Sequence, residues 1–415
     1  MQVAVIGGGV IGVCTAYFLA EAGHEVTLIE RQGNVAEQAS FGNAGIVAPA
    51  YATPWATPGM PRKFLSYLFK NEAPVLFRPS LEPALWRWLG QWISECDLQR
   101  FRANRDRMQR VAQYSNHMLR QLRVQHNLDY EQTCGYTQLF RSERDIGLVQ
   151  PLLALLSEHG VPHAMLGAAA ARALEPGLSE HTPLAGALHL PDDETGNCSL
   201  FTKQLKQAAQ ALGVNFQFGS KVQSISTYGS RIGLLIENQE HFADAAVVAA
   251  GTDSAQLLAR LGIHVPLYPV KGYSATVGIK DFEQAPKAAV IDEAYKVAIV
   301  RMGSRIRIAG LAELGSRTPD LRDAALRTLI KVGEDWFPNA ANFRTAQFWT
   351  GSRPTLPDGP PVLGPTSVKN LYLNIGHGPT GWAMAAGSGK LLADIVTGHK
   401  PEINIEGLTL ARFAR

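Results

Sequence analysis

The first thirty residues contain two short apolar runs separated by a helical pattern. Residues 3–6 form a β-branched run that stops at a cluster of glycines, residues 13–22 have helical character, and residues 25–30 form a second apolar run. Short apolar runs are typical of buried parallel strands, and a helix between them supplies the crossover. The pattern predicts a strand, a helix and a second strand, with a glycine-rich first turn.

Beyond Ser40 the pattern changes. Seven prolines break up the segment between residues 49 and 83, and a long polar helix is expected from about Asp97 to Gln125. Residues 135–141 alternate as a sheet strand does, residues 144–158 look helical, and residues 185–190 resemble another strand. Mixed α and β structure is therefore expected outside the first unit.

The parallel-strand pattern returns in the second half of the chain. A helix is expected over residues 199–212 and a strand over residues 214–218, while the apolar run 245–250 ends at Gly251, which suggests another loop at a ligand. Strands dominate from about residue 264 to residue 350. The last part holds a strand over residues 371–375, a glycine-rich turn and a long helix through Ile395.

These patterns predict an α/β fold in which a Rossmann-like domain is interleaved with an α+β domain containing a mostly antiparallel sheet. A chain of 415 residues exceeds the size of a single hydrophobic core, so two domains are expected. The nucleotide-binding domain is assigned to residues 1–48, 197–262 and 353–415. The substrate-binding domain is assigned to residues 49–196 and 263–352.

Composition excludes several classes of protein. Hydrophobic residues make up 46% of the chain and charged residues 18%, which is unlike a disordered protein. The net charge of +3, without a block of Lys and Arg, gives no reason to expect a nucleic-acid partner. The four cysteines are widely scattered and have no histidine at metal spacing, so no metal site is expected.

A cytoplasmic location is expected. The N-terminal residues enter the first strand directly, which leaves no room for a secretion signal. No stretch approaches the ~20 consecutive apolar residues that cross a bilayer. Peripheral contact with the cytoplasmic face of the inner membrane stays open as an addition to this expectation.

One segment suggests such a contact, because three tryptophans precede five arginines. The residues are Trp86, Trp88, Trp92, Arg100, Arg102, Arg105, Arg107 and Arg110. Aromatic anchors beside cations suit an anionic leaflet. Packed tryptophans followed by a solvated helix face would explain the same pattern.

The first glycine cluster has the spacing Gly7-x-Gly9-x-x-Gly12. In such a turn the glycines allow a tight bend, close approach of a pyrophosphate and close packing of helix on strand, and the helix N-terminus offers N–H groups to the anion. Glu30, at the end of the second strand, is placed to accept hydrogen bonds from ribose hydroxyls. A dinucleotide is therefore expected. Its site is also expected to include Val10, Ile11 and Arg31.

A second glycine-rich turn, residues 374–382, leads into the last helix. The N-terminus of that helix could lie against the N1/C2 carbonyl edge of a flavin, where negative charge gathers on reduction. An NAD enzyme does not need this feature, so the turn favours FAD, although a simple strand-to-helix connection could have the same residues. The expected contacts are Gly376, His377, Gly378, Thr380, Gly381 and Trp382.

Seven segments together carry a resemblance to a known family. They are residues 1–30, Ala39-Ser-Phe-Gly-Asn-Ala-Gly45, Tyr51-Ala-Thr-Pro-Trp55, Thr137-Gln-Leu-Phe-Arg141, Tyr268-Pro-Val-Lys-Gly-Tyr273, Trp349-Thr-Gly-Ser-Arg-Pro354 and Gly376-His-Gly378. Across nearly the whole chain the sequence resembles the bacterial D-amino acid dehydrogenase small subunit. That family lies within the D-amino acid oxidase and glycine oxidase superfamily of flavoproteins.

The resemblance implies roles for individual residues. Arg353, in a Gly-x-Arg-Pro motif, would pair with the substrate carboxylate through two parallel N–H bonds. Tyr273 and Tyr268 lie in a segment that supplies an active-site tyrosine in relatives, but either could equally be a core aromatic. Val222 would hold the adenine through its backbone. A loop of small residues would lie along the flavin, namely Ser40, Asn43, Ala44 and Gly45.

The resemblance also implies an activity. A small neutral D-amino acid such as D-alanine would pass hydride from Cα to flavin N5, giving a 2-oxo acid and ammonia, and the electrons would pass to a quinone or another respiratory acceptor. Residues 51–55 are expected to fold over the substrate, and His377 is expected to act through its backbone. Oxidation of glycine, sarcosine, D-proline or D-hydroxyproline and a catalytically silent FAD-binding subunit stay open as alternatives.

Overall fold

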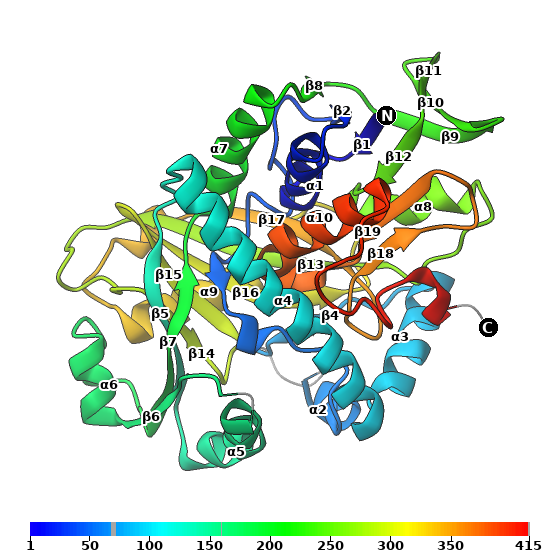
Figure 1. Ribbon diagram of the computed structural model, residues 1–415. Helices are drawn as coiled ribbons and strands as arrows, with labels where there is room; N and C mark the ends of the chain where they lie inside the picture. Colours follow the sequence, from blue (N-terminus) through cyan, green and yellow to red (C-terminus); the bar gives the residue numbers. More distant parts are fainter. Residues whose placement is uncertain (68–71, 159, 414–415) are drawn as a thin grey trace.

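The computed structural model describes residues 1–67, 72–158 and 160–413 (Figure 1). A six-stranded sheet has the order β18-β19-β12-β1-β2-β8, so the N-terminal strand lies near its centre. All its strands pair in parallel except β18, which is antiparallel to β19. The strands are β1 (Gln2–Ile6), β2 (Glu25–Ile29), β8 (Asn215–Gln217), β12 (Ala245–Val248), β18 (Val362–Pro365) and β19 (Leu371–Ile375).

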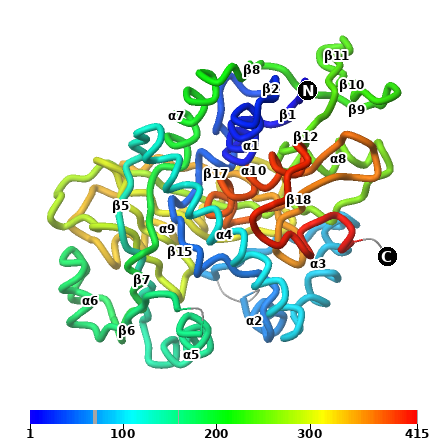
Figure 2. Tube along the Cα trace, viewed as in Figure 1, coloured from blue at the N-terminus to red at the C-terminus, as the bar shows by residue number. Residues whose placement is uncertain are grey.

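Apolar helices cover one face of this sheet. α1 (Val10–Glu21) and α10 (Gly381–Thr397) are buried on most sides, and α7 (Cys198–Ala211) packs beside α1. Figure 2 shows the first and last helices, near the blue and red ends of the chain, side by side. They can approach closely because Gly389 has no side chain: a Cβ at this position would lie 2.8 Å from the Cys14 backbone. Helices of this kind, which have no polar face, are stable only inside a fold.

The long polar helix expected from about Asp97 is α4 (Leu98–His126), which packs against α10. Asp97 caps it, because one carboxylate oxygen accepts from the backbone N–H groups of Gln99 and Arg100 at 2.9 and 3.1 Å. Asn127, in the left-handed conformation with φ 47°, ends it. The expectation for this helix is confirmed to within one residue at each end.

A small antiparallel sheet and a short helix cover the opposite face of the six-stranded sheet. The sheet consists of β9 (Val222–Tyr228), β10 (Arg231–Ile236) and β11 (Gln239–Ala243), and the helix is α8 (Ser254–Ala259). The sequence pattern had not indicated this sheet. Val222, expected to follow a strand, is the first residue of one.

A second, ten-stranded sheet is mostly antiparallel, as expected. Its order is β17-β13-β16-β15-β14-β5-β7-β3, with β4 added beside β16 and β6 beside β7. Its strands are β3 (Ile46–Val47), β4 (Val75–Phe77), β5 (Thr133–Phe140), β6 (Ala164–Gly167), β7 (Gly186–Thr195), β13 (Tyr268–Gly278), β14 (Ala289–Asp292), β15 (Val297–Met302), β16 (Arg305–Leu314) and β17 (Gln347–Thr355).

Two strands of the large sheet do not follow the domain assignment expected from the sequence. The boundary at residue 353 cuts β17, and β3 pairs with β7 although residues up to 48 were assigned to the nucleotide domain. The chain passes between the two sheets in the connection from β2 to β3 and in the connection from β17 to β18. As a result, Arg353 lies in the substrate-side sheet.

Several helices were missed in segments read as proline-rich or strand-rich. α9 (Asp323–Trp336) packs on one face of the large sheet, so the expectation of strands from residue 264 to 350 is wrong there. α2 (Met60–Tyr67) and α3 (Pro83–Glu95) lie in the proline-rich segment. Pro83 stands at the first turn of α3, where a missing N–H costs nothing. The remaining helices are α5 (Glu143–Glu158) and α6 (Ala168–Leu174).

The tryptophans of α3 are mainly core residues. Trp88 and Trp92 are 3% and 5% exposed and stack with ring centroids 6.3 Å apart, so neither is available as a membrane anchor. Trp86 is 54% exposed, whereas Arg105 on α4 is buried. In the described ranges, no helix has both the length and the apolar character to span a bilayer.

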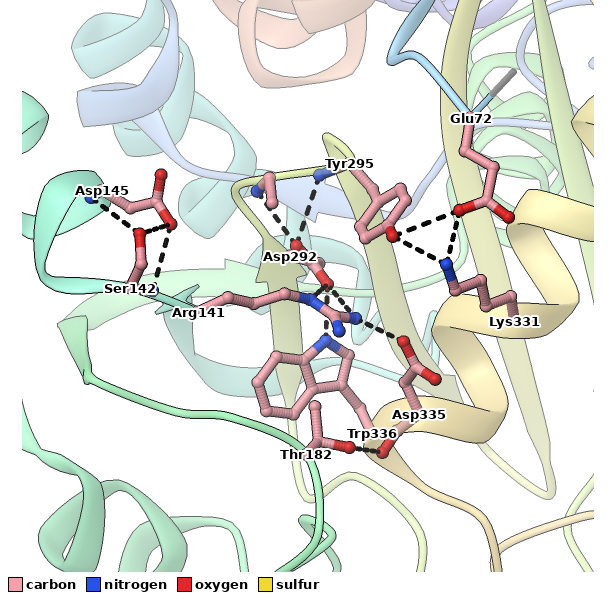
Figure 3. A network of polar contacts seen from close by, with 11 residues as sticks. Glu72, Arg141, Ser142, Asp145, Thr182, Asp292, Tyr295, Lys331, Asp335 and Trp336 are labelled. Carbon is pink, nitrogen blue, oxygen red and sulfur yellow. Dashed lines mark hydrogen bonds and ion pairs between the residues drawn. The ribbon is translucent and has the colours of Figure 1, made fainter. Parts of the chain in front are cut away.

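A buried ion pair joins three elements of the substrate-side unit (Figure 3). Arg141, at the end of β5, donates from Nε to Asp292 Oδ2 at 2.7 Å, and Trp336 Nε1 donates to the same oxygen at 2.8 Å. The guanidinium also reaches Asp335 at 2.7 Å. Asp292 is fully buried, so its charge depends on these donors for compensation.

We expect Asp292→Ala to lower the free energy of unfolding by about 3–5 kcal/mol, because it leaves the Arg141 charge without its buried partner. The control is Asp335→Ala, which removes a partner that is 28% exposed and should cost about 1 kcal/mol or less. Urea unfolding followed by tryptophan fluorescence measures both. Equal losses would contradict the importance of the inner pair.

Candidate active site

A cavity of about 1070 Å³ is lined by residues of both sheets. It lies beyond the carboxyl ends of β1 and β12, where open α/β sheets bind ligands. Most of the expected site residues line it: Gly7, Gly9, Val10, Ile11, Glu30, Arg31, Ser40, Asn43, Ala44, Val222, Gly251, Tyr273, Arg353, Gly376, His377, Gly378, Thr380, Gly381 and Trp382. The lining does not include Gly12, Gly45 or Tyr268.

The first glycine turn brings the N-terminus of α1 to the cavity. Gly7 has φ +116°, and a Cβ there would lie 2.4 Å from the Ala249 carbonyl oxygen. A Cβ at Gly12 would lie 1.8 Å from the Gly7 oxygen, so Gly12 allows the helix to pack closely on the first turn. Gly9 precedes the helix and offers no side-chain cap, which leaves N–H groups of the first turn for an anion.

Glu30 is held at the rim of the cavity by the backbone. Its Oε2 accepts from Gly8 N at 2.6 Å and its Oε1 from Gln32 N at 2.8 Å. A carboxylate has lone pairs beyond these two bonds, so it can still accept from ribose hydroxyls. Arg31 and Asp253 form an ion pair beside it, and both line the cavity.

The loop after β2 is fixed from three sides. Ser40 Oγ accepts from Val10 N at 3.0 Å, and Asn43 Oδ1 accepts from Gly45 N at 2.8 Å. Arg307, on β16, donates to the carbonyl oxygens of Phe41 and Asn43 at 2.7 and 3.1 Å. Gly45 is a packing residue, because a Cβ there would lie 2.6 Å from the Gly196 oxygen. Its assignment as a cofactor contact is therefore not supported by its position.

The second glycine turn directs the N-terminus of α10 toward the same cavity. Gly376 has φ +82°, and an antiparallel bridge joins His377 to Thr355 at the end of β17. His377 bonds Ser388 Oγ through Nε2 at 3.0 Å, and burial lowers its pKa to about 3. The imidazole is therefore neutral at physiological pH and occupied by a structural bond, consistent with a backbone role.

Polar atoms beside this turn lack protein partners. Within the described part of the chain, nothing hydrogen-bonds the buried Thr380 Oγ1 or Trp382 Nε1, and α10 has no side-chain cap. Buried polar groups are normally paired, so unpaired ones at a cavity indicate a missing ligand group. These donors suit the polar edge of a flavin ring.

Arg353 lies on the cavity face of β17. A Cβ at Gly272 on the adjacent strand β13 would lie 2.4 Å from the Arg353 Cζ, so the guanidinium rests over this glycine. It donates to the carbonyl oxygens of Leu311 at 2.9 Å and Gly310 at 3.4 Å. Leu311 is left-handed, with φ +56°, at a bulge of β16 that turns its carbonyl to this position.

No carboxylate in the described ranges forms an ion pair with Arg353. Burial lowers its pKa to about 10, which still leaves the guanidinium charged at neutral pH. Buried charges are normally compensated. The arrangement can therefore bind a carboxylate from a ligand in the cavity.

The two tyrosines are placed differently from the expectation. Successive residues of a strand point to opposite faces, so Tyr273 points away from the face that carries Gly272 and Arg353. It packs in the core with α9 and donates its hydroxyl to the buried carboxylate of Glu313. Tyr268 packs on Trp88 in another core cluster, and its hydroxyl lies 3.4 Å from Glu82. Both rings pack in core clusters and both hydroxyls have structural partners, although Tyr273 also borders the cavity; their assignment as catalytic residues stays a prediction.

Other cavity residues were not identified from the sequence, apart from Tyr51 in the expected lid. Lys296 lines the cavity with Tyr51, Met60, Phe64 and Trp349. Trp349 could have been found by alternation, because it stands four residues before Arg353 on the same face. Lys296 had no such signal, since its position depends on a hairpin turn. The residues of α2 were hidden by the prolines around them.

The residues of this cavity fit FAD. Glu30 and the N-terminus of α1 supply what an adenosine and a pyrophosphate require, and Thr380 and Trp382 leave donors free near the second turn. Arg353 then provides a carboxylate site beyond them. The cavity can thus hold both a dinucleotide and a small acid.

Comparison with known proteins agrees with this geometry. The D-amino acid dehydrogenase of Bradyrhizobium diazoefficiens is 46% identical, covering 100% of this chain and 99% of that protein. Glycine oxidase from Geobacillus kaustophilus has a similar fold, with a TM-score of 0.78 at 22% identity and 99% coverage of both chains. L-proline dehydrogenase from P. horikoshii also has a TM-score of 0.78, at 18% identity, covering 100% of this chain and 98% of that one. The family of FAD dependent oxidoreductases matches residues 2–395, and the chain therefore belongs to that family.

Proposed function

We propose that this protein oxidises a D-amino acid to a 2-oxo acid and ammonia with FAD as its cofactor. The observation that carries the proposal is the Arg353 guanidinium, a cation in the cavity wall that has no acidic partner among the described residues. The name of the full-length relatives, D-amino acid dehydrogenase, supports the D configuration and the dehydrogenase class. Small neutral substrates such as D-alanine fit the apolar residues of the lining.

The first task of the chain is to orient the substrate. A guanidinium binds a carboxylate through two parallel hydrogen bonds, which fix the plane of the acid and hence the direction of the Cα–H bond. The carbonyl oxygens of Leu311 and Gly310 hold the guanidinium in place for this purpose. Orientation of this kind can contribute several kcal/mol to lowering a barrier.

The second task is to favour the neutral amine. The acidic residues of the described lining, Glu30, Glu37 and Asp253, come from the nucleotide-side segments, whereas Arg353 and Lys296 bring positive charge to the substrate side. Nearby cations disfavour an ammonium group, so they lower the pKa of the substrate amine. The proton leaves to solvent, and no side-chain base is required.

FAD, when bound, supplies the hydride acceptor for the Cα–H bond. As hydride leaves Cα, the amine lone pair forms a C=N bond, which gives an imino acid. Water then hydrolyses this bond to a 2-oxo acid and ammonia. The apolar wall from α2 and the residues around Trp55 would restrict water until the imino acid leaves.

We further propose that electrons leave to a membrane quinone through peripheral contact. Leu81, Trp86 and Ile93, on and just before α3, are 97%, 54% and 54% exposed, and Arg87 on the same helix is exposed. We call these three apolar residues the α3 patch. Exposed apolar residues beside a cation suit an anionic lipid surface. Oxygen is the alternative acceptor.

Anaerobic titration of the yellow protein tests the main proposal. D-alanine should bleach the flavin absorbance, and L-alanine should not, because the anchored carboxylate presents only one Cα–H direction. Faster bleaching by glycine, sarcosine, D-proline or D-hydroxyproline would favour those substrates instead. Persistent colour with every amino acid would identify a catalytically silent subunit.

Replacing the anchor should affect substrate binding and leave the cofactor in place. We expect Arg353→Lys and Arg353→Gln to raise KM for D-alanine by about 10- to 100-fold, the range for a lost charged hydrogen bond, with unchanged FAD content. The exposed Arg344→Gln serves as the matched control. Unchanged KM in both Arg353 variants would show that the carboxylate binds elsewhere.

The membrane proposal predicts that a double variant of the α3 patch, Trp86→Ser with Ile93→Ser, lowers co-sedimentation with anionic liposomes by several-fold, since two exposed apolar side chains are lost. It should also lower quinone reduction in those liposomes more than reduction of a soluble dye. The exposed Val124→Ser on α4 is the control. Equal sedimentation, or stoichiometric peroxide in air, would argue against this acceptor route.

A further inference from the structure

The turn between β14 and β15 places a lysine at the cavity. Asp292 Oδ1 accepts from the backbone N–H groups of Ala294 and Tyr295 at 3.0 and 3.3 Å, which fixes the turn. Lys296 follows with φ +54°, a left-handed conformation that is unfavourable for a lysine. Figure 3 shows Arg141 against Asp292 with the ring of Tyr295 nearby, so a buried ion pair supports this strained turn.

Lys296 is close to the groups that hold Arg353. Val297 pairs with Gly310 on β16, and the Lys296 carbonyl oxygen lies 2.6 Å from where a Cβ of Gly310 would be. Gly310 and Leu311 are the residues whose carbonyl oxygens accept from Arg353. Adjacent strands are about 4.8 Å apart, which is comparable to the length of an amino acid side chain. A substrate anchored at Arg353 can therefore extend its side chain toward Lys296.

The charge presented to the cavity at this place is positive. Lys296 pairs with Glu293, but the lysine side chain is 48% exposed and lines the cavity, whereas Glu293 is 14% exposed and is not part of the lining. The rings of Tyr51 and Tyr67 also line this region, and the ammonium lies 6.0 Å from the Tyr51 ring centroid. Burial alone would lower the pKa of Lys296, but Glu293 and Tyr51 raise it above its usual value.

We propose that Lys296 determines which substrate side chains the cavity accepts, favouring neutral or anionic ends and opposing cationic ones. This inference rests on the proposed function, because it takes the carboxylate of the substrate to be held by Arg353. Like charges within a few ångströms repel in a partly desolvated site, while a neutral side chain can pack on Tyr51 and Tyr67.

Three ligands with the same five-carbon chain test the inference without turnover. Pentanoate, glutarate and 5-aminopentanoate share one carboxylate and differ in the charge of the far end. Their dissociation constants are measured on the FAD-loaded protein from the change in flavin absorbance. The wild-type protein should bind 5-aminopentanoate about tenfold or more weakly than glutarate, as expected for opposite charges facing one ammonium.

Lys296→Met and Lys296→Asn should reduce this ratio at least about fivefold, and Asn tolerates the left-handed turn. Lys296→Arg should keep the ratio, because the cation remains. Lys400→Met, at an exposed site outside the cavity lining, is the matched control and should also keep it. A general loss of structure would weaken all three ligands together and would not change their ratio.

An unchanged ratio in Lys296→Met and Lys296→Asn, with pentanoate bound as tightly as by the wild-type protein, would overturn the inference. The carboxylate anchor is tested separately, since Arg353→Lys should weaken pentanoate as much as the other two ligands. If Arg353→Lys left pentanoate binding intact, the proposed function would lose its anchor while the ratio still reported on Lys296. The two failures are therefore distinguishable.

Discussion

The close approach of α1 and α10 is the constraint on which the cavity depends. Because Gly389 has no side chain, its helix rests directly on the backbone of Cys14, and the two helices share one apolar interface. Each helix begins at a glycine turn, so both positive ends are directed to one cavity. Segments from the two ends of the chain thus form a single binding site.

The second constraint is the alternation of side chains along β13 and β17. Gly272 leaves space on one face for the guanidinium of Arg353, and the next residue, Tyr273, necessarily points into the core on the other face. The bulge at Leu311 adds two carbonyl oxygens to the cavity face. One strand pair therefore separates a ligand-binding group from a structural network with Glu313.

Local patterns in the sequence were sufficient for the elements with strong periodicity. The first strand–helix–strand unit, α4 and α10 were expected correctly. Most residues predicted to bind the cofactor line the cavity, because glycine turns encode their own geometry. α9, a helix of 14 residues, and the small antiparallel sheet were missed, because both lie within segments whose overall pattern favoured other elements. Mixed α and β signals also placed two domain boundaries away from the sheet assignments.

The substrate side was harder to predict because it depends on contacts between distant segments. Which side chains of β13 and β17 share the face of Arg353 follows from strand register, which no single segment specifies. The position of Lys296 depends on Asp292, which is held by Arg141, 151 positions earlier in the sequence. Composition and spacing contain no record of such pairings.

The bridge between Thr355 and His377 ties the end of β17 to the flavin-side turn only two residues beyond Arg353. Arg353, the proposed carboxylate anchor, and the second glycine turn are therefore coupled mechanically through a short connection. Shifts of the outer strands or of α2 could widen or narrow the far end of the cavity without altering the separation at its inner end. Evolution could change the range of accepted molecules in this fold while the reacting geometry stays constant.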